Sequence, residues 1–484
     1  MQDAASAPAP AVDTKRYLPW VVAIVLFMET LDTTIVNTAI PSMAASLHVD
    51  PLSLKAVVAS YILSLAVCIP VSGWMADRFG TRRVFFTAVS VFTTASLLCG
   101  LALNPPMLVA ARLLQGVGAA MMMPVGRLVI IRTYSKSELL SAMNFVVMPA
   151  LVGPLLGPTL GGIIVHLASW RFIFWVNLPV GAIALTMIWR FLPDYKAQAP
   201  RPLDVIGFVL FGSGIALLSW LLEIFGEHRL DATSTIVLLV IAVGLLAAYG
   251  LHASRTANPL LRLALFRIRT FRISVAGGFI TRIGMGGMPF LLPLLYQLGM
   301  GLPAWESGLL MMPSAAAAIT MKFATQRILR MLGYKRVLTI NTVMIGCAIG
   351  TFSLIGPSTP KPLIVLLALT LGLFNSLQFS SMNTLAYADV EGADTSMAST
   401  LASSMQQLSM SFGLAAGSLV AAWFLDGLPQ TDHALVTRAL HHAFLALAAI
   451  TIVSSVSFWN LKRNDGEAVS KGTARRVGVE PNAQ

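Results

Sequence analysis

Long apolar segments recur along the whole of this chain, separated by short polar loops. A membrane-spanning α-helix needs about 20 consecutive, mostly apolar residues. The apolar residues run continuously and do not alternate with polar ones, which favours helices over the strands of a barrel. The sequence therefore predicts an all-α polytopic membrane protein with 14 transmembrane helices. The predicted helices lie near residues 18–40, 54–75, 84–104, 106–130, 139–167, 172–192, 204–224, 234–253, 271–298, 306–327, 337–356, 362–387, 396–424 and 438–461.

The composition indicates a lipid environment. Hydrophobic residues make up 56% of the 484 residues and charged residues only 11%, whereas soluble domains carry about 25% charged residues. The net charge of +12 comes from basic residues scattered over many short loops. Such scattering argues against a nucleic-acid partner, which would need one continuous basic surface. The expected partner is the lipid bilayer.

The placement of lysine and arginine predicts the orientation of the helices, because cytoplasmic loops carry an excess of both. With a cytoplasmic N-terminus, most basic loop residues fall on the cytoplasmic side. The outer loops then receive only Lys55, Arg171, Arg229, Lys361 and Arg438. We therefore expect both termini in the cytoplasm.

The second half of the chain weakly repeats the first. Residues 79–83, after the second predicted helix, match residues 332–336, after the tenth, and both stretches place glycine before basic residues. Small residues at a spacing of four lie on one helix face and allow close helix contact. They occur in the fifth helix (Gly153, Gly157, Gly161) and in the thirteenth (Gly413, Gly417, Ala421).

This register predicts two pseudo-symmetric six-helix bundles and an inserted helix pair. The predicted divisions are a cytoplasmic tail (1–17), an N-terminal bundle (18–192), the inserted helices with their loops (193–270), a C-terminal bundle (271–461) and a second cytoplasmic tail (462–484). Two such bundles imply a central cavity that opens to alternate sides of the membrane.

Five motifs in the first half resemble those of one transporter family. Residues 31–41 (LDTTIVNTAIP) lie in the first helix, and residues 73–83 (GWMADRFGTRR) follow the second. Residues 112–120 (RLLQGVGAA) lie in the fourth helix, residues 153–162 (GPLLGPTLGG) in the fifth, and residues 170–179 (WRFIFWVNLP) open the sixth. Together they resemble the major facilitator superfamily, most closely its fourteen-helix drug:proton antiporters.

The resemblance implies a proton-coupled exporter of small lipophilic compounds in a bacterial inner membrane, with a periplasmic adaptor left open as a further partner. It assigns a cytoplasmic gate to Gly73, Asp77, Arg78, Gly80 and Arg82. It assigns an antiporter motif to Gly153, Gly157, Pro158, Gly161 and Gly162. The alternatives are a solvated loop that only sets topology and an ordinary helix-packing face.

Four charged residues lie deep inside predicted helices. A charge at the centre of a bilayer costs about 3 kcal/mol or more, so each is a candidate functional residue. Counting about 1.5 Å per residue along each helix, Asp32 and Arg112 reach a similar depth. Glu29 and Arg282 both lie near mid-bilayer. We expect Asp32 and Arg112 to form an ion pair, and Glu29 and Arg282 to face each other across the cavity.

A carboxylate that takes a proton from one side and releases it to the other can couple transport to the proton gradient. A cation partner that comes and goes changes how firmly a carboxylate holds its proton. Asp32, with Arg112 beside it, is the first candidate because it lies in the first-helix motif of the resemblance, and Glu29 is the second. The alternative is a pair that only fixes helix packing. Arg282 is either a structural cation or a site for an anionic or polarised substrate group.

The twelfth predicted helix corresponds to the fourth but carries amides in place of the arginine. Asn375 and Gln378 are the predicted pocket residues of this helix. The alternative is that such amides hydrogen-bond neighbouring helices.

Other function classes lack their signatures. No Gly-rich loop ending in Lys-Ser/Thr is present, so ATP is not the expected energy source. No nucleophile–base arrangement or metal-ligand cluster occurs either, which argues against an enzyme, a metal site and a cofactor. The predicted function is multidrug efflux coupled to protons. The alternatives are the transport of one specific metabolite and, in a different class, a non-transporting membrane sensor; the charge of the substrate stays open.

Overall fold

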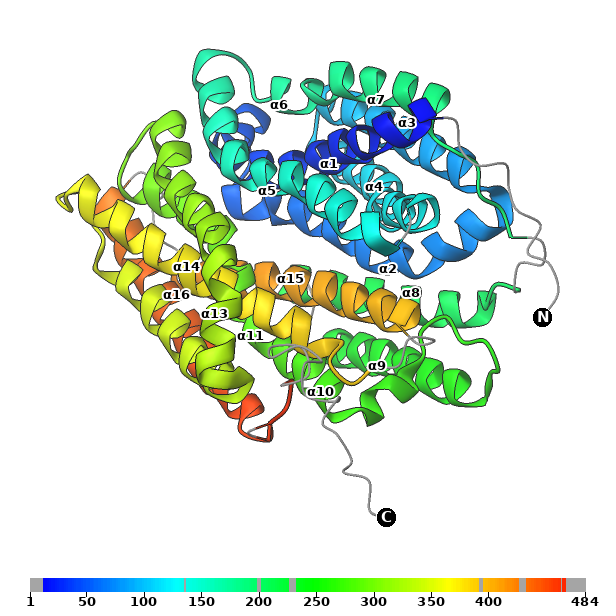
Figure 1. Ribbon diagram of the computed structural model, residues 1–484. Coiled ribbons are helices and arrows are strands. Elements are labelled where there is room, and N and C mark those ends of the chain that lie inside the picture. Colours follow the sequence, from blue (N-terminus) through cyan, green and yellow to red (C-terminus); the bar gives the residue numbers. More distant parts are fainter. Residues whose placement is uncertain are drawn as a thin grey trace.

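A computed structural model shows a chain built of helices (Figure 1). It describes residues 12–134, 136–197, 202–225, 232–390, 395–425, 432–462 and 464–466, and no strand occurs in these ranges. Most of the two predicted tails therefore lies outside the described residues. The all-helical fold of a polytopic membrane protein is confirmed.

All fourteen predicted segments overlap helices, but fewer of the described helices are long and apolar enough to span a membrane. By length and apolarity, eleven helical stretches of the described chain could cross a membrane. One of these stretches, Ala304–Leu354, covers two predicted segments. Two other predicted segments correspond to apolar helices that are shorter than a span, Val152–Leu167 and Val205–Leu221. The count of 14 thus stays a prediction.

The first seven helices pack mainly on one another and are coloured from blue through cyan to blue-green in Figure 1. Extensive contacts join α1 to α5, α2 to α4, and α3 to both α4 and α7. These helices are α1 (Val12–Leu47), α2 (Lys55–Phe79), α3 (Thr81–Gly100), α4 (Pro105–Thr133), α5 (Lys136–Leu167), α6 (Phe172–Trp175) and α7 (Asn177–Phe191), with the short turn η1 (Pro51–Leu54) before α2.

The later helices form a second group, in which α13 packs on α14 and α16, and α11 packs on α15. The main helices are α11 (Gly278–Gly286), α12 (Met288–Leu294), α13 (Ala304–Thr351), α14 (Lys361–Ala386), α15 (Thr395–Leu425) and α16 (His433–Ser454). The shorter pieces are η2 (Leu263–Arg267), α10 (Arg269–Arg272), η3 (Ile273–Gly277), η4 (Leu295–Gly299), η5 (Phe352–Leu354) and η7 (Ser455–Phe458).

Two further helices, α8 (Val205–Phe225) and α9 (Ala232–Arg255), pack on each other, and α8 also touches α2 and α15. The two large groups meet where α5 contacts α13 and where α2 contacts α15.

Local sequence explains where several helices begin. Asn104 accepts a hydrogen bond from the Met107 N–H and precedes Pro105, which is the arrangement favoured at a helix start. Asp432 caps α16 in the same way. Gly333 bends α13, because its φ of 75° lies in the left-handed region that favours glycine.

Candidate functional site

An ion pair between Asp32 on α1 and Arg112 on α4 lies at the centre of the first helix group. The Arg112 guanidinium donates to Asp32 Oδ2 over 2.6 Å, and both side chains are buried. The guanidinium also lies over the Tyr61 ring, 4.2 Å from its centroid, and donates to the carbonyl of Val57. The predicted pairing of Asp32 with Arg112 is confirmed.

Two amides that the sequence did not single out complete the shell around Asp32. Gln115 Nε2 and Asn177 Nδ2 donate to Asp32 Oδ1 over 2.9 and 2.8 Å. Gln115 Oε1 in turn accepts from Arg112 over 2.7 Å. These donors satisfy the oxygens of the buried carboxylate, which lowers the cost of burying it.

Asn177 lies at this position just after an interruption of the helix, between α6 and α7. Asn177 is the first residue of α7 and also donates to the hydroxyl of Ser96 on α3. Ser96 donates onward to the carbonyl of Phe174 in α6. The network thus ties five helices (α2, α3, α4, α6 and α7) to one carboxylate of α1. Both amides lie in the motifs quoted from the sequence. Their polar side chains inside otherwise apolar helices were the signal that could have identified them.

Glu29, one helical turn before Asp32, is also buried but lacks such a shell. Its Oε2 has no hydrogen-bond partner among the described residues. Asp32 and Arg127 of α4 are the charged groups that act on it electrostatically. A buried polar atom without a partner is uncommon and calls for an explanation.

Arg282 on α11 contacts residues of α14. Its Nη2 donates to Asn383 Oδ1 over 3.3 Å, and its guanidinium lies 5.4 Å from the centroid of the Phe379 ring. The Nε atom has no partner within the described chain. Arg282 is thus bonded to Asn383. The expectation that Arg282 faces Glu29 across a cavity remains a prediction.

The two predicted amides of α14 have different surroundings. Gln378 is fully buried; it donates to Thr342 over 2.7 Å and accepts from Asn341 over 2.9 Å. These bonds are the helix–helix contacts of the alternative interpretation. Asn375 differs, because its Oδ1 has no hydrogen-bond partner in the described residues.

The turn between α2 and α3 is held by ion pairs and hydrogen bonds within the first helix group. Asp77 pairs with Arg132 at the end of α4 over 2.9 Å. Gly80 adopts a φ of 95°, and any side chain there would overlap the carboxylate of Asp194. That carboxylate accepts a hydrogen bond from the Arg82 N–H over 3.0 Å. Gly73 and Arg78 are exposed.

The helix α5 uses its glycines to approach α1. A methyl group added to Gly153, Gly157 or Gly161 would overlap Thr30, Thr34 or Thr38, which follow one another at the same spacing of four on α1. Close contact between the backbones is the reason that glycine is needed there.

The second group repeats this contact. Gly413 and Gly417 of α15 lie against Gly286 and Gly287, which flank the join between α11 and α12. The small-residue face expected in the thirteenth predicted helix is therefore a contact face here too.

A different face of α5 joins the two groups. Gly162 lies against the backbone of Ala304, and Gly308 of α13 lies against the carbonyl of Pro158. Thr159 donates to the Gly308 carbonyl over 3.3 Å, and Gln297 of η4 donates to the carbonyl of Thr38 in α1 over 3.1 Å. We call this contact the α5–α13 seam.

No group of three or more potential metal ligands occurs in the described part of the chain. The site instead consists of a buried carboxylate with an arginine partner, a second buried carboxyl group, and a buried arginine on the other helix group. Such groups can bind or release protons and polar parts of a ligand.

Comparison with known proteins identifies relatives over nearly the whole chain. A family model described as Major Facilitator Superfamily matches residues 22–414. Proteins named multidrug resistance protein MdtD are similar in sequence. The one from Pectobacterium carotovorum is 41% identical over 92% of this chain and 95% of its own, and the one from an Enterobacter species is 39% identical over 95% and 98%.

Solved transporter structures share the fold. A D-xylose–proton symporter aligns with a TM-score of 0.68 at 13% identity, over 93% of this chain and 99% of its own. A bacterial homologue of the lysosomal transporter Spinster, in an inward-facing state, aligns with a TM-score of 0.67 at 13% identity, over 93% and 98%.

Proposed function

The chain belongs to the major facilitator superfamily, and on that premise we propose that it is a multidrug efflux transporter that exports small lipophilic compounds in exchange for protons. It is a transporter and not an enzyme. The relatives named multidrug resistance protein support the efflux function. The buried carboxylate of Asp32 supports the coupling to protons. A charged residue inside the membrane is costly, so its presence there points to a function such as carrying a proton.

We propose two six-helix bundles, residues 18–192 and 271–461, with an inserted pair between them. The repeated glycine contacts support this division, since α5 meets α1 as α15 meets α11 and α12. The basic residues support a cytoplasmic N-terminus in a bacterial inner membrane. In that orientation the α5–α13 seam lies at the outer end of the cavity and closes it in this state.

In this proposal, Asp32 and Glu29 both take part in proton coupling. Asp32 accepts hydrogen bonds from Arg112, Gln115 and Asn177. Glu29 has no such shell, and its Oε2 has no hydrogen-bond partner among the described residues. Protonation of Asp32 would weaken its bond to Arg112 and loosen α1 from α4.

The proposed cavity residues are Arg282 and Asn375, whose buried Nε and Oδ1 atoms have no hydrogen-bond partner in the described part of the chain. Gln378 acts as a helix–helix contact instead. The proposed cytoplasmic gate is the turn from Gly73 to Arg82. In this state the bond from Asp77 to Arg132 and the bond from the Arg82 N–H to Asp194 hold the turn against the rest of the first helix group.

The ion pair of Asp32 with Arg112 carries the proposal, and proton movement tests it. The purified protein is placed in sealed proteoliposomes under an imposed pH gradient, and matched lipophilic cations, neutral compounds and weak acids are added. We expect compound-dependent proton flux that Asp32→Asn abolishes. Asp432→Asn is the matched control, because Asp432 only caps α16 and asparagine caps equally well.

No flux with any compound, from folded protein, would contradict multidrug efflux. A response to weak acids alone would favour the second candidate, export of a specific anionic metabolite. The buried Arg282, with its unpartnered Nε, is the observation that supports that candidate.

A further inference from the structure

The two helix groups contain equivalent turns with different surroundings. The first places Gly80 before Thr81, Arg82 and Arg83, and the second places Gly333 before Tyr334, Lys335 and Arg336. Both glycines have positive φ, 95° and 75°. In both, the residues after the glycine begin a helix, so the positive end of the helix dipole points into the turn.

The first turn binds a carboxylate of the chain itself. Asp194, which follows α7, accepts a hydrogen bond from the Arg82 N–H and lies against Gly80. A helix start with a glycine beside it is a suitable place for an anionic group, because backbone N–H groups and the dipole both favour negative charge. The protein thus shows which kind of group this turn accepts.

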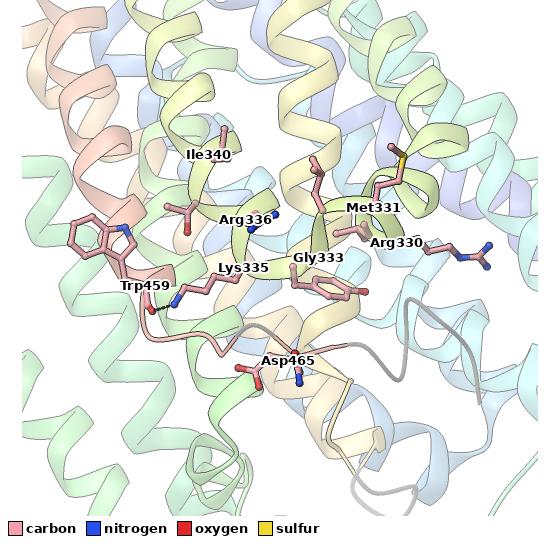
Figure 2. A pocket seen from close by; sticks show the side chains of 13 residues that line it. Arg330, Met331, Gly333, Lys335, Arg336, Ile340, Trp459 and Asp465 are labelled. Atoms are coloured by element: carbon pink, nitrogen blue, oxygen red, sulfur yellow. Dashed lines mark hydrogen bonds between the residues drawn. The ribbon is translucent and has the colours of Figure 1, made fainter. Parts of the chain in front are cut away.

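The second turn borders a cavity of about 680 Å³ (Figure 2). Three basic side chains line it: Arg330, Lys335 and Arg336. Asp465 is the carboxylate of the lining, and it is already bonded to Arg269 and to the Lys462 N–H. Thr339 adds a buried hydroxyl without a partner among the described residues. The cavity therefore offers positive charge to an anion.

Lys335 keeps donors for such an anion. It gives one hydrogen bond to the Trp459 carbonyl over 2.8 Å, drawn as a dashed line in Figure 2, and an ammonium group has three donors. Arg336 is exposed and projects from the first turn of the helix after Gly333.

Apolar side chains at the cavity indicate an anion with hydrocarbon attached. Trp459 is 60% exposed and Ile340 58% exposed, and both line the cavity. Leu332 lies on the same rim. Tryptophan and basic side chains at the ends of spanning helices are typical of the level of lipid headgroups. A free anion would leave this apolar rim unused.

We propose that this cavity binds the headgroup phosphate of an anionic phospholipid, with Lys335 and Arg336 as its cationic ligands and the acyl chains along Leu332 and Ile340. The phosphate would take the place at the second turn that Asp194 takes at the first. This proposal depends on the protein being in a membrane and does not depend on which substrate it transports.

Native mass spectrometry of the full-length protein in detergent tests the proposal. The protein is titrated with phosphatidylglycerol, with phosphatidylcholine of the same acyl chains, and with inorganic phosphate as a competitor. Arg336→Gln is the test variant. Arg83→Gln is the matched control, since Arg83 is exposed, has the same charge and holds the equivalent place in the first turn.

We expect Arg336→Gln to weaken binding of phosphatidylglycerol about fivefold, the effect of one basic residue close to an anionic headgroup. Arg83→Gln should leave the affinity unchanged, and both variants should melt at the wild-type temperature. Equal losses in both variants would show unspecific surface charge and overturn the proposal. Equally tight binding of phosphatidylcholine, or displacement of the lipid by millimolar inorganic phosphate, would overturn it too, the latter in favour of a free-anion site.

Discussion

The pairing of Asp32 with Arg112 serves both stability and proton coupling in our proposal, and variants can separate the two roles. Asp32→Asn leaves the Arg112 charge buried without a counter-charge, which should lower the free energy of unfolding by about 3–5 kcal/mol. Adding Arg112→Gln removes that charge and should recover much of the stability. We expect the double variant to regain its melting temperature but not its proton flux.

The same variants also test the packing interpretation. If the pair only held α1 against α4, restoring stability in the double variant would restore transport as well. A double variant that moves protons at the wild-type rate with a drug present would therefore remove Asp32 from the coupling mechanism.

Asp204, just before α8, gives a prediction about pH. Burial alone would raise the pKa of its carboxyl group, but the Gly207 N–H, the His252 ring and the Leu260 N–H together lower it. A lowered pKa means that the folded state stabilises the carboxylate. This stabilisation is complete above about pH 4 and is lost as the pH falls further, through the lowered pKa.

We therefore expect Asp204→Asn to lower the melting temperature at neutral pH, by a loss of about 1 kcal/mol, because the hydrogen bonds to this residue are stronger when it carries a charge. The difference from the wild type should shrink as the pH falls below about 4. Melting curves recorded across this range provide the measurement. A difference that is constant down to pH 3 would show that the carboxylate charge plays no part.

Sequence alone predicted the main ion pair but not its surroundings. Counting residues along a helix gives the depth of a side chain, and depth was enough to pair Asp32 with Arg112. It does not give the direction in which a side chain points, so Gln115 and Asn177 were missed, and the bonds of Gln378 to α13 were not foreseen. Asp194 was also missed, because a loop residue gives no periodic signal.

At the scale of the element, the glycine face of α5 determines how closely α1 can approach. Gly157→Ala would place a methyl group into Thr34, and overpacking of this kind costs about 1–3 kcal/mol. We expect a lower melting temperature, partly recovered by adding Thr34→Ala. Gly244→Ala is the control, because nothing lies near its new methyl group and it should not destabilise the protein. Equal effects of the two alanines would contradict a packing role for this face.

The helices themselves were predictable, since long apolar runs with glycine or proline at their ends leave few alternatives in a membrane. What periodicity did not show is how the segments join. Gly333 lets two predicted segments follow one another within α13, and the segment predicted at 271–298 divides into α10, α11, α12 and two π-helical turns. Such irregular backbone depends on packing against neighbouring helices, which one sequence does not reveal.

At the scale of the whole molecule, alternating access requires contacts between the bundles that break and re-form. In our proposal the α5–α13 seam is such a contact, because small residues bring the backbones of the two groups together there. Gly308→Ala would place a methyl group against the Pro158 carbonyl while leaving the contacts inside each bundle unchanged. The closed form of this end should therefore become less populated.

A cysteine at Gln297 can report on this change, because Gln297 bonds across the same end to the Thr38 carbonyl. In a variant with serine at Cys68, Cys99 and Cys347, we expect Gly308→Ala to increase labelling of this cysteine by an impermeant maleimide added outside sealed vesicles, and to slow transport. Gly350→Ala on the same helix is the control, since its methyl group meets only an ordinary contact with Ala448. Unchanged labelling in Gly308→Ala would mean that the seam does not limit opening of this end, and the closing contact would then have to lie elsewhere between the bundles.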